Sequence, residues 1–404
     1  MTDQAVDPFE AFEQAMAQGV RDPYPEWAEM RRQSPVHELD LREEYGLGED
    51  FDMELPRAFH VLSYDGVTQV LRDPETFSSS YYADTMGMVM GHSILEMDEP
   101  EHHHYRGLIQ QAFTRKALDR WRDELVRPMV TEIVDDMASR GQADLVRELT
   151  FPFPVRVIAG MLGLPAEDLP QFHRWAVELI SVGFDLEVGM AASQKLRDYF
   201  ASVLAPRRAQ PQDDLISVLA HAELDGVTLD DEQIFAFLRL LLPAGAETTY
   251  RSSSNLLFGL LTNPDQLAAL QADRSLLPQA IEEGIRWEPP LTGIARWSTR
   301  DVEVDGVPVA AQSVIQVNMG SANRDEKRWE RAEQFDIFRP PLQHVSFALG
   351  PHTCLGMHLA RMETTVAMET ILDRLPNLRL DPTAEDIHIH GRAFRAPQSL
   401  PVLC

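Results

Sequence analysis

A cysteine between two glycines, near the C-terminal end of the chain, is the residue whose type and spacing best suit metal chemistry. It lies in the segment Phe347-Ala348-Leu349-Gly350-Pro351-His352-Thr353-Cys354-Leu355-Gly356, which an apolar, helix-compatible stretch follows. A thiolate that ligates a metal needs hydrogen-bond donors, and the N-terminus of a helix supplies them. We therefore expect the N–H groups of residues 355–357 to point at the Cys354 sulfur. Gly350 permits the turn that presents the cysteine, and Gly356 lets a flat ligand approach the backbone. For a lone cysteine, the alternative is a buried structural residue beside a turn.

An acid and an alcohol, Glu247 and Thr248, follow two helix breakers inside a long apolar stretch, Leu241-Leu242-Pro243-Ala244-Gly245-Ala246-Glu247-Thr248-Thr249. Inside a helix Gly costs about 1 kcal/mol relative to Ala, and Pro roughly 3 kcal/mol. Pro243 cannot donate to the carbonyl of Arg239, and the Thr248 hydroxyl could compete for the carbonyl of Ala244. The pattern predicts an opened helical turn that could admit dioxygen and a water. The alternative is a kinked core helix with Glu247 turned to solvent.

The elements that must position these residues are mainly helical. Apolar residues recur at three- and four-residue spacing over Ala117–Ala138, Leu169–Leu179, Val188–Leu204, Asp231–Leu261, Pro264–Ala272, Pro278–Trp287 and Leu355–Leu375. Short β-like runs are fewer: Ala58–Leu62, Trp297–Val304, Val307–Val309, Val314–Met319 and a C-terminal pair near Leu378 and Leu400. Asp230 or Asp231 could cap the long central helix, and Pro278 suits a first helical turn. The breaker-rich stretch 206–214 predicts a surface loop.

Composition narrows the class of protein. At 404 residues the chain has the length of about two domains, but no linker divides it. Hydrophobic residues make up 44%, and no segment reaches the roughly 20 apolar residues of a membrane span. Acidic residues exceed basic ones by 28, which disfavours nucleic acid and anionic membranes as partners. Two cysteines, Cys354 and Cys404, cannot form a disulfide framework, and the acidic N-terminus lacks the layout of a signal peptide. We expect an intracellular, cytoplasmic protein.

The cysteine segment resembles the haem-thiolate signature of the cytochrome P-450 family, and other motifs occur in that family's order. These motifs are Asp98–Arg106, Leu241–Thr249, the E-x-x-R pair Glu283 and Arg286, and the loop stretches Ala322–Asp325 and Phe335–Pro340. The resemblance implies the family's single, triangular, mainly α domain over residues 1–404, with a small β part. It also implies haem b, held between the helix of the acid–alcohol pair and the helix after Cys354. Glu283, Arg286 and Arg339 would form a buried charge network that braces the cysteine loop.

By this resemblance, Cys354 is the axial thiolate ligand of the iron, and thiolate ligation favours cleavage of the O–O bond. Thr248 would hydrogen-bond the bound oxygen, and Glu247 would help to relay protons. Pro243 departs from the family's commonest aliphatic residue there, which leaves the local helix geometry open. The other residues implied to bind the cofactor are His102, Arg106, Ala244, Gly245, Arg296, Phe347, His352 and Gly356.

The substrate pocket that we expect is apolar and adaptable, because methionine fits irregular apolar shapes. Its candidate residues, each of which could instead be core packing, are Met86, Met88, Met90, Leu238, Leu242, Ala244, Leu291, Ile294 and Phe394. A terpenoid, a steroid, a fatty acid or an aromatic compound would suit such a pocket equally.

The implied function is that of a monooxygenase, which uses dioxygen and two externally supplied electrons to hydroxylate or otherwise oxidise an apolar organic substrate. No flavin or nicotinamide fingerprint is present, and soluble bacterial-type members of the family are served by a ferredoxin and its reductase. The basic stretch Arg106–Arg127, with Arg361, is the expected docking patch, although solvated helix faces often carry similar charge. We expect a monomer. A peroxide-driven peroxygenase, which usually lacks the acid–alcohol pair, and a non-catalytic haem sensor remain the alternatives.

Overall fold

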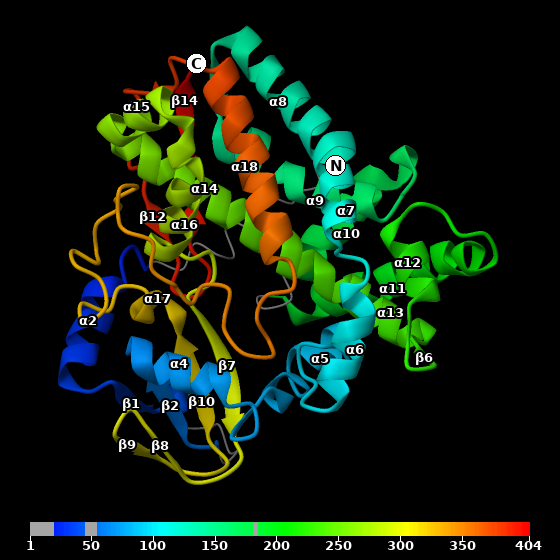
Figure 1. Cartoon of the computed structure of the whole chain (residues 1–404), viewed down its shortest axis with the longest axis vertical. Helices are drawn as coiled ribbons and strands as arrows, with labels where there is room; N and C mark the ends of the chain where they lie inside the picture. Colours follow the sequence, from blue (N-terminus) through cyan, green and yellow to red (C-terminus); the bar gives the residue numbers. More distant parts are fainter. Residues whose placement is uncertain (1–19, 45–54, 181–184) are drawn as a thin grey trace, which may run out of the picture.

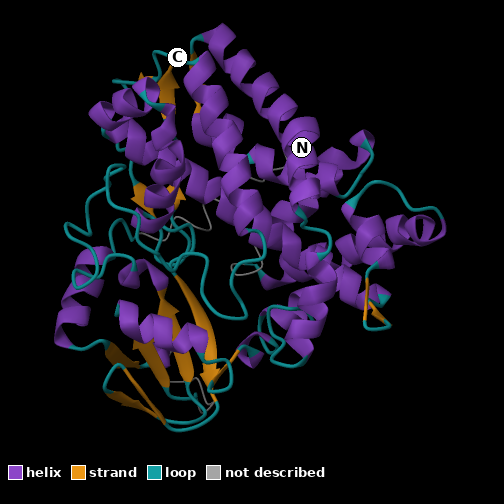
Figure 2. Cartoon of the chain, in the orientation of Figure 1, coloured by secondary structure: helices purple, strands orange, loops and turns teal. Residues whose placement is uncertain are grey.

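The computed structural model describes residues 20–44, 55–180 and 185–404. The molecule has a roughly triangular outline, with helices over most of it and a sheet at one corner (Figures 1 and 2). This is the mainly α architecture with a small β part that the sequence predicts. Within these described ranges no helix is both long and apolar enough to cross a bilayer.

The helices follow one another along the described part of the chain. They are α2 (Tyr24–Gln33), α3 (Leu41–Glu44), α4 (Tyr64–Arg72), α5 (Met86–Met90), α6 (Glu101–Gln110), α7 (Arg115–Trp121), α8 (Arg127–Arg140), α9 (Pro152–Met161), α10 (Leu169–Ile180), α11 (Leu186–Ala209), α12 (Leu215–His221), α13 (Asp231–Leu241), α14 (Thr248–Thr262), α15 (Pro264–Ala272), α16 (Leu277–Trp287), α17 (Met319–Ala322) and α18 (Met357–Arg374). Turns of π-helix continue this array at Arg122–Val126, Val146–Thr150 and Leu242–Glu247.

The sheet at the corner has five strands in the order β1-β2-β10-β7-β3. Its strands are β1 (Val36–Leu39), β2 (Ala58–Val61), β10 (Val314–Asn318), β7 (Gly293–Ser298) and β3 (Phe77–Ser78). Strand β10 pairs with β2 in parallel and with β7 in antiparallel, so β7 holds Arg296 opposite Ile315. The smaller sheets use β4 (Gln142–Asp144), β5 (Glu223–Leu224), β6 (Val227–Thr228), β8 (Val302–Val304), β9 (Val307–Val309), β11 (Arg379–Leu380), β12 (Ile389–His390), β13 (Ala396–Pro397) and β14 (Pro401–Leu403).

Helices α14 and α18 pack against each other near the centre of the helical part, as Figure 1 shows. The Ser253 and Thr364 hydroxyl oxygens lie 3.4 Å apart across this contact. Buried Glu363 of α18 accepts a hydrogen bond from the Thr249 side chain of α14. Helix α14 begins at Thr248, and α18 begins just after Cys354, so this packing fixes the two chemically important segments relative to each other.

Two expectations about element boundaries are wrong. The predicted loop at 206–214 begins only at residue 210, because α11 runs through Pro206 to Ala209. Arg207 bonds Asp214 and Arg208 bonds Asp231, and these contacts hold the last turn of the helix.

The expected strand Trp297–Val304 is also wrong, because it is two strands. Strand β7 ends at Ser298, and β8 instead forms a hairpin with β9. The N–H of Thr299 donates to the carbonyl of Thr76, which draws the chain out of line between the two strands.

Candidate active site

The loop before α18 presents Cys354 through a tight reversal of the backbone. Gly350 adopts a φ of +73°, and a Cβ there would lie 2.4 Å from the carbonyl oxygen of Leu71. Only glycine fits both the angle and the space. The Cys354 N–H then donates to the carbonyl of Phe347 at 2.8 Å, which closes the loop. The role predicted for Gly350 is confirmed.

The Cys354 sulfur sits where a helix N-terminus can hold a negative charge. It accepts hydrogen bonds from the N–H groups of Gly356 and Met357, two of the donors that the sequence predicts. Burial raises the pKa of the thiol, whereas these donors and the positive charges of Arg106 and Arg361 lower it. The side chain is nonetheless accessible. The sulfur therefore lies in a recess that is open to a ligand, and its thiolate form could bind a metal cation there.

Two arginines and two histidines gather beside this recess. Arg296 of β7 is 5% exposed, and Arg106 of α6 donates to the carbonyl of Thr353. Neither forms an ion pair with a carboxylate in the described part of the chain. The rings of His102 and His352 stack with centroids 4.0 Å apart. Burial, followed by the charges of His102 and both arginines, lowers the pKa of His352 to about 3, so this ring is neutral near pH 7.

These residues fit the haem that the sequence implies. A haem carries two propionates, which need cationic or hydrogen-bonding partners. Neither guanidinium forms an ion pair with a described carboxylate, and Nε2 of buried His102 has no hydrogen-bond partner among the same residues. A Cβ on Gly356 would meet nothing within 4 Å, so a flat ligand has room beside the cysteine.

The long central helix, which comprises α13 and α14, opens at the turn that the sequence predicts. Between α13 and α14, residues Leu242–Glu247 form a π-helical turn that contains Pro243. The Thr248 hydroxyl donates to the carbonyl of Ala244 at 2.7 Å. Ala244 is exposed although its neighbours Leu242 and Ala246 are buried. Open space therefore borders this side of the helix, and Thr248 faces it in part. At the start of the same helix, Asp230 is the N-cap, within a capping box.

The other two residues of this motif face elsewhere. Glu247 is buried, and its Oε1 lies 3.1 Å from Nη2 of Arg251. The predicted alternative, in which Glu247 turns to solvent, is wrong. A Cβ on Gly245 would point at Ile158 of α9, 3.2 Å away, so the absence of a side chain there lets two helices approach. A haem contact of Gly245 stays a prediction for its backbone.

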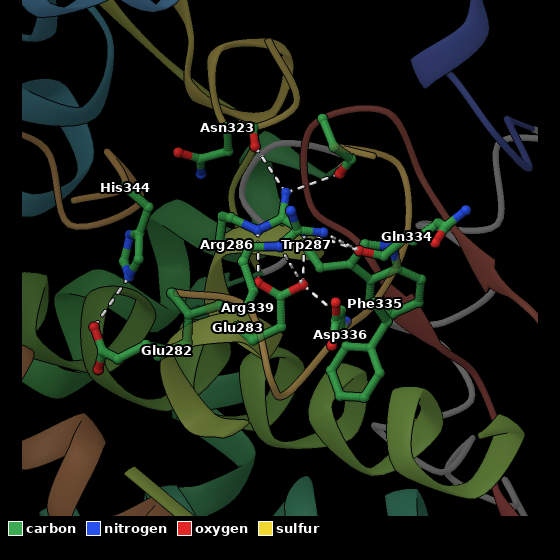
Figure 3. Close-up of polar contacts among 12 residues, drawn as sticks. Glu282, Glu283, Arg286, Trp287, Asn323, Gln334, Phe335, Asp336, Arg339 and His344 are labelled. Atoms are coloured by element: carbon green, nitrogen blue, oxygen red, sulfur yellow. Dashed lines mark hydrogen bonds and ion pairs between the residues drawn. The ribbon is translucent and has the colours of Figure 1, made fainter. Parts of the chain in front are cut away.

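The expected charge network of Glu283, Arg286 and Arg339 is present (Figure 3). Glu283 accepts two hydrogen bonds of 2.7 Å from Arg286 and one of 3.2 Å from Arg339, and all three residues are buried. Arg286 also donates to the carbonyl of Asn323 at 2.9 Å. The Asn323 side chain accepts from the N–H of Val345, at the start of the cysteine loop. The network thereby braces the segment that presents Cys354.

The candidate pocket residues do not form one surface. Leu291 and Phe394 pair directly through a β-bridge, and Ile294 follows on β7. The others divide by exposure: Leu238, Leu242 and Met90 are buried in the main core, Met86 is half-buried, and Met88 is 63% exposed. Core packing, which the sequence left open, describes the buried ones. A substrate contact stays a prediction for the rest.

The basic stretch 106–127 carries less free charge than its composition indicates. Arg106 turns inward to Thr353. The other arginines meet carboxylates: Arg115 meets Asp119, Arg120 meets Asp213, Arg122 meets Asp119 and Asp123, and Arg127 meets Glu369. Arg361 likewise bonds Glu282 through two contacts of 2.6 and 2.8 Å. Most of the expected docking patch is thus neutralised within the protein.

Arg251 is the residue of this site that the sequence interpretation missed. Its guanidinium is fully buried, pairs with Glu247, and lies 5.6 Å from the ring centroid of Phe394. The signal was available, because an acid and a base four residues apart share one face of a helix.

Phe347 and His352 of the cysteine loop both contact side chains outside the loop, and their contact with haem stays a prediction. The Arg361 guanidinium covers the Phe347 ring at 4.6 Å, and His352 Nε2 lies 3.1 Å from the Ser79 hydroxyl. His352 thus links the loop to Ser79, which is distant in the sequence, whereas Phe347 contacts Arg361 of α18, the helix that directly follows the loop.

Known proteins share this sequence and architecture. A family model described as Cytochrome P450 matches residues 185–387. The putative cytochrome P450 YjiB of Bacillus subtilis is 32% identical over 385 residues, covering 92% of this chain and 93% of that protein. The steroid C26-monooxygenase of Mycobacterium tuberculosis is 36% identical over 326 residues, covering 79% and 87%. The structure of CYP109E1 from Bacillus megaterium in complex with testosterone superposes with a TM-score of 0.84 at 32% identity, covering 95% of this chain and 99% of that one. The chain belongs to the cytochrome P450 family, whose members use haem with a cysteine thiolate ligand.

Proposed function

We propose that this P450 monooxygenase oxidises an apolar small molecule with dioxygen, using electrons from a separate ferredoxin and its reductase. One arrangement supports the proposal. The Cys354 sulfur accepts hydrogen bonds from two N–H groups at the start of α18. Helix α18 packs against α14, which begins at Thr248 directly after the opened turn. Haem bound there would supply the redox chemistry that activates dioxygen. Every other role falls to this chain's own residues.

The residues around Cys354 hold the cofactor and balance its charge. Cys354 would ligate the iron, and hydrogen bonds from the N–H groups at the helix N-terminus would stabilise the negative charge of its thiolate. Arg106 and Arg296 would each donate to a propionate, and His102 would add its unpaired Nε2. Arg296 is buried, neither arginine is paired with a carboxylate in the described part of the chain, and Nε2 of His102 has no hydrogen-bond partner there.

Thr248 would act as a hydrogen-bond acceptor in the groove. A hydroxyl has one hydrogen to donate and two lone pairs to accept with. The hydrogen of Thr248 already goes to the carbonyl of Ala244. Its lone pairs can therefore accept a hydrogen bond from another donor, such as a water, on the open side of the helix. Glu247, held by Arg251 on a buried side, would supply protons only after leaving that ion pair.

The test compares two threonines with the same local bond. Thr248 and Thr262 both donate to the carbonyl four residues earlier at 2.7 Å, but Thr262 lies at the far end of α14. We expect Thr248→Ala to keep substrate affinity while product per reduced cofactor falls and peroxide rises. Thr262→Ala should leave that ratio unchanged. Full coupling in Thr248→Ala would contradict the role proposed for this hydroxyl.

The substrate would be apolar and could have the size of a steroid. The relatives include a steroid C26-monooxygenase, and two of the similar CYP109E1 structures are complexes, one with testosterone and one with corticosterone. In this chain, Leu291 and Phe394 form the best-defined apolar pair among the candidate pocket residues. Screening steroids, terpenoids and fatty acids for a change of haem spin state would identify the class.

Electrons would enter on the side of α18 that faces solvent. A surface hollow of about 480 Å³ lies there, lined by Arg122, Asp123, Arg127, Met362, Thr365, Val366 and Glu369. Because most of its charges are paired, we expect reduction by ferredoxin to depend only weakly on salt. Reversal of one cation, Lys116→Glu, should slow it slightly. A steep fall of the reduction rate with salt would place docking on another face.

A further inference from the structure

Three side chains meet where α16 and α18 approach the cysteine loop. Arg361 of α18 donates two hydrogen bonds to Glu282 of α16, from Nε to Oε1 at 2.6 Å and from Nη2 to Oε2 at 2.8 Å. Nε2 of His344, which lies just before the cysteine loop, is 3.2 Å from the same Oε2 (Figure 3). Glu282 therefore joins both helices to the start of the loop.

The ring of His344 is a neutral hydrogen-bond donor in this cluster. Its Nδ1 accepts a hydrogen bond from the N–H of Ser346 at 3.3 Å. A ring nitrogen that accepts carries no hydrogen, so the hydrogen of His344 lies on Nε2 and is donated to Glu282. Burial alone would raise the pKa of Glu282, but hydrogen bonds from His344 and Arg361 lower it to about 2. The cluster thus contains one cation, one anion and one neutral donor.

The cation of this cluster acts on the Cys354 sulfur. The Arg361 guanidinium lies 4.6 Å from the ring centroid of Phe347, and the carbonyl of Phe347 accepts the N–H of Cys354 at 2.8 Å. Burial raises the pKa of the Cys354 thiol, and the charges of Arg106 and Arg361 are among the effects that lower it. Positive charge from Arg361 therefore reaches the sulfur, and Glu282 is the anion that opposes this charge.

A charge near the sulfur changes how readily a haem bound there accepts an electron. Reduction of ferric to ferrous haem adds one negative charge, so a nearby cation favours the ferrous state and a nearby anion favours the ferric state. Arg361 and Glu282 carry opposite charges, so each limits the effect of the other. Their side chains are 31% and 34% exposed, and water consequently screens part of both effects.

We propose that Arg361 and Glu282 form a charge pair that adjusts the reduction potential of the haem. Arg361 is the cation beside the thiolate, and Glu282 is a positioning residue that holds this cation and partly cancels it. The proposal rests on ligation of haem by Cys354 and involves neither the substrate nor the electron donor. His344 holds Glu282 independently of Arg361, and the Phe347 ring holds Arg361 independently of Glu282. Either charge can therefore be removed while the other stays in place.

A purely structural role leads to a different pattern. If the pair only braces the cysteine loop, loss of either partner breaks the same contact, and both single variants change the potential in the same direction or not at all. If the pair acts through charge, the two single variants have opposite signs. The experiment is a reductive titration of the haem-loaded protein without substrate, in which dithionite supplies one electron to each ferric haem.

The variants remove the two charges separately and together. We expect Arg361→Met to shift the equilibrium constant of reduction roughly tenfold toward the ferric state, which is about 59 mV for one electron. Glu282→Gln should shift it roughly threefold toward the ferrous state, because the smaller change comes from the opposing charge. The double variant should lie between the two.

A matched control comes from an exposed ion pair at the sheet. Arg57 donates to Glu38 of β1 through two hydrogen bonds of 2.7 and 3.0 Å, the same two-bond geometry as in the pair of Arg361 and Glu282. Arg57→Met and Glu38→Gln make the same changes of net charge far from the cysteine in the sequence. Both should leave the reduction potential unchanged.

The C–O stretching frequency of the ferrous–carbonyl complex provides an independent measurement. A thiolate that donates less electron density leaves the iron with less to return to the carbonyl, and the C–O bond becomes stronger. The frequency should therefore rise in Glu282→Gln and fall in Arg361→Met.

Shifts of the same sign in both single variants, or no shift in either, would overturn the proposal. If one single variant does not load haem, the other decides, because an unchanged potential or a shift of the wrong sign in it refutes an effect of charge. These outcomes are separable from the proposed function. A normal ferrous–carbonyl band in the variants, combined with any of these contrary results, refutes only the role of the charge pair.

Discussion

Replacement of Gly350 by alanine should damage the cysteine loop more than the same change at another left-handed glycine. Gly141 caps α8 with a φ of +71°, and a Cβ there meets nothing within 4 Å. Gly141→Ala should therefore cost about 1 kcal/mol of stability, from backbone strain alone. Gly350 has nearly the same φ, but its Cβ would lie 2.4 Å from the Leu71 oxygen. Overpacking of this kind adds about 1–3 kcal/mol, so Gly350→Ala should cost roughly 2–4 kcal/mol in total.

The assay is urea unfolding of the haem-loaded protein, followed by loss of the ferrous–carbonyl band. At equal slope, the shift in midpoint measures the change in stability. Gly350→Ala should also load less haem, because relief of the clash moves the bond between the Cys354 N–H and the Phe347 carbonyl. Gly141→Ala should load normally. If the two variants have the same midpoint and haem content, the loop does not depend on the close approach to Leu71, and the reasoning is refuted.

Three further substitutions and one matched control test the network, the propionate partners and the buried carboxyl. Glu283→Gln should cost about 3–5 kcal/mol, because it leaves buried guanidinium groups unbalanced; Glu282→Gln, one residue earlier and partly exposed, should cost less than about 1 kcal/mol by the same urea assay. Arg296→Met should release haem to an acceptor protein roughly tenfold faster, because a charge-assisted bond is lost; an unchanged rate would exclude Arg296 as a propionate partner. Burial raises the pKa of Glu363 to about 8, so the unfolded chain loses its proton first as the pH rises and the folded state loses stability between about pH 4.5 and 8. The stabilising effect of Glu363→Gln should consequently grow from pH 5 to pH 8, and a constant difference would contradict burial as the cause.

Periodicity was sufficient to predict the helices that hold the site. The long central helix of α13 and α14, together with α16 and α18, lies within a few residues of the predicted ranges, because apolar faces at helical spacing must pack against a core. The ends were less predictable. Helix α11 continues through Pro206 because Arg207 bonds Asp214 and Arg208 bonds Asp231, pairings that helical periodicity does not specify. Strand β1 was missed because its four residues alternate too briefly to stand out.

The chemistry-bearing residues were predictable only where one short segment contains the whole constellation. The cysteine loop and the back-bond of Thr248 are local, so residue types and spacing were enough. The orientation of Glu247 was not predictable, since it depends on a buried partner on the next turn.

The central claim is that Cys354, and not the other thiol Cys404, ligates the haem iron. The most direct measurement is the ferrous–carbonyl absorption spectrum of the wild type, Cys354→His and Cys404→Ser, each loaded with haem. The account predicts the red-shifted band of thiolate ligation in the wild type and in Cys404→Ser. The band should be absent from Cys354→His. An unchanged band in Cys354→His would contradict the account.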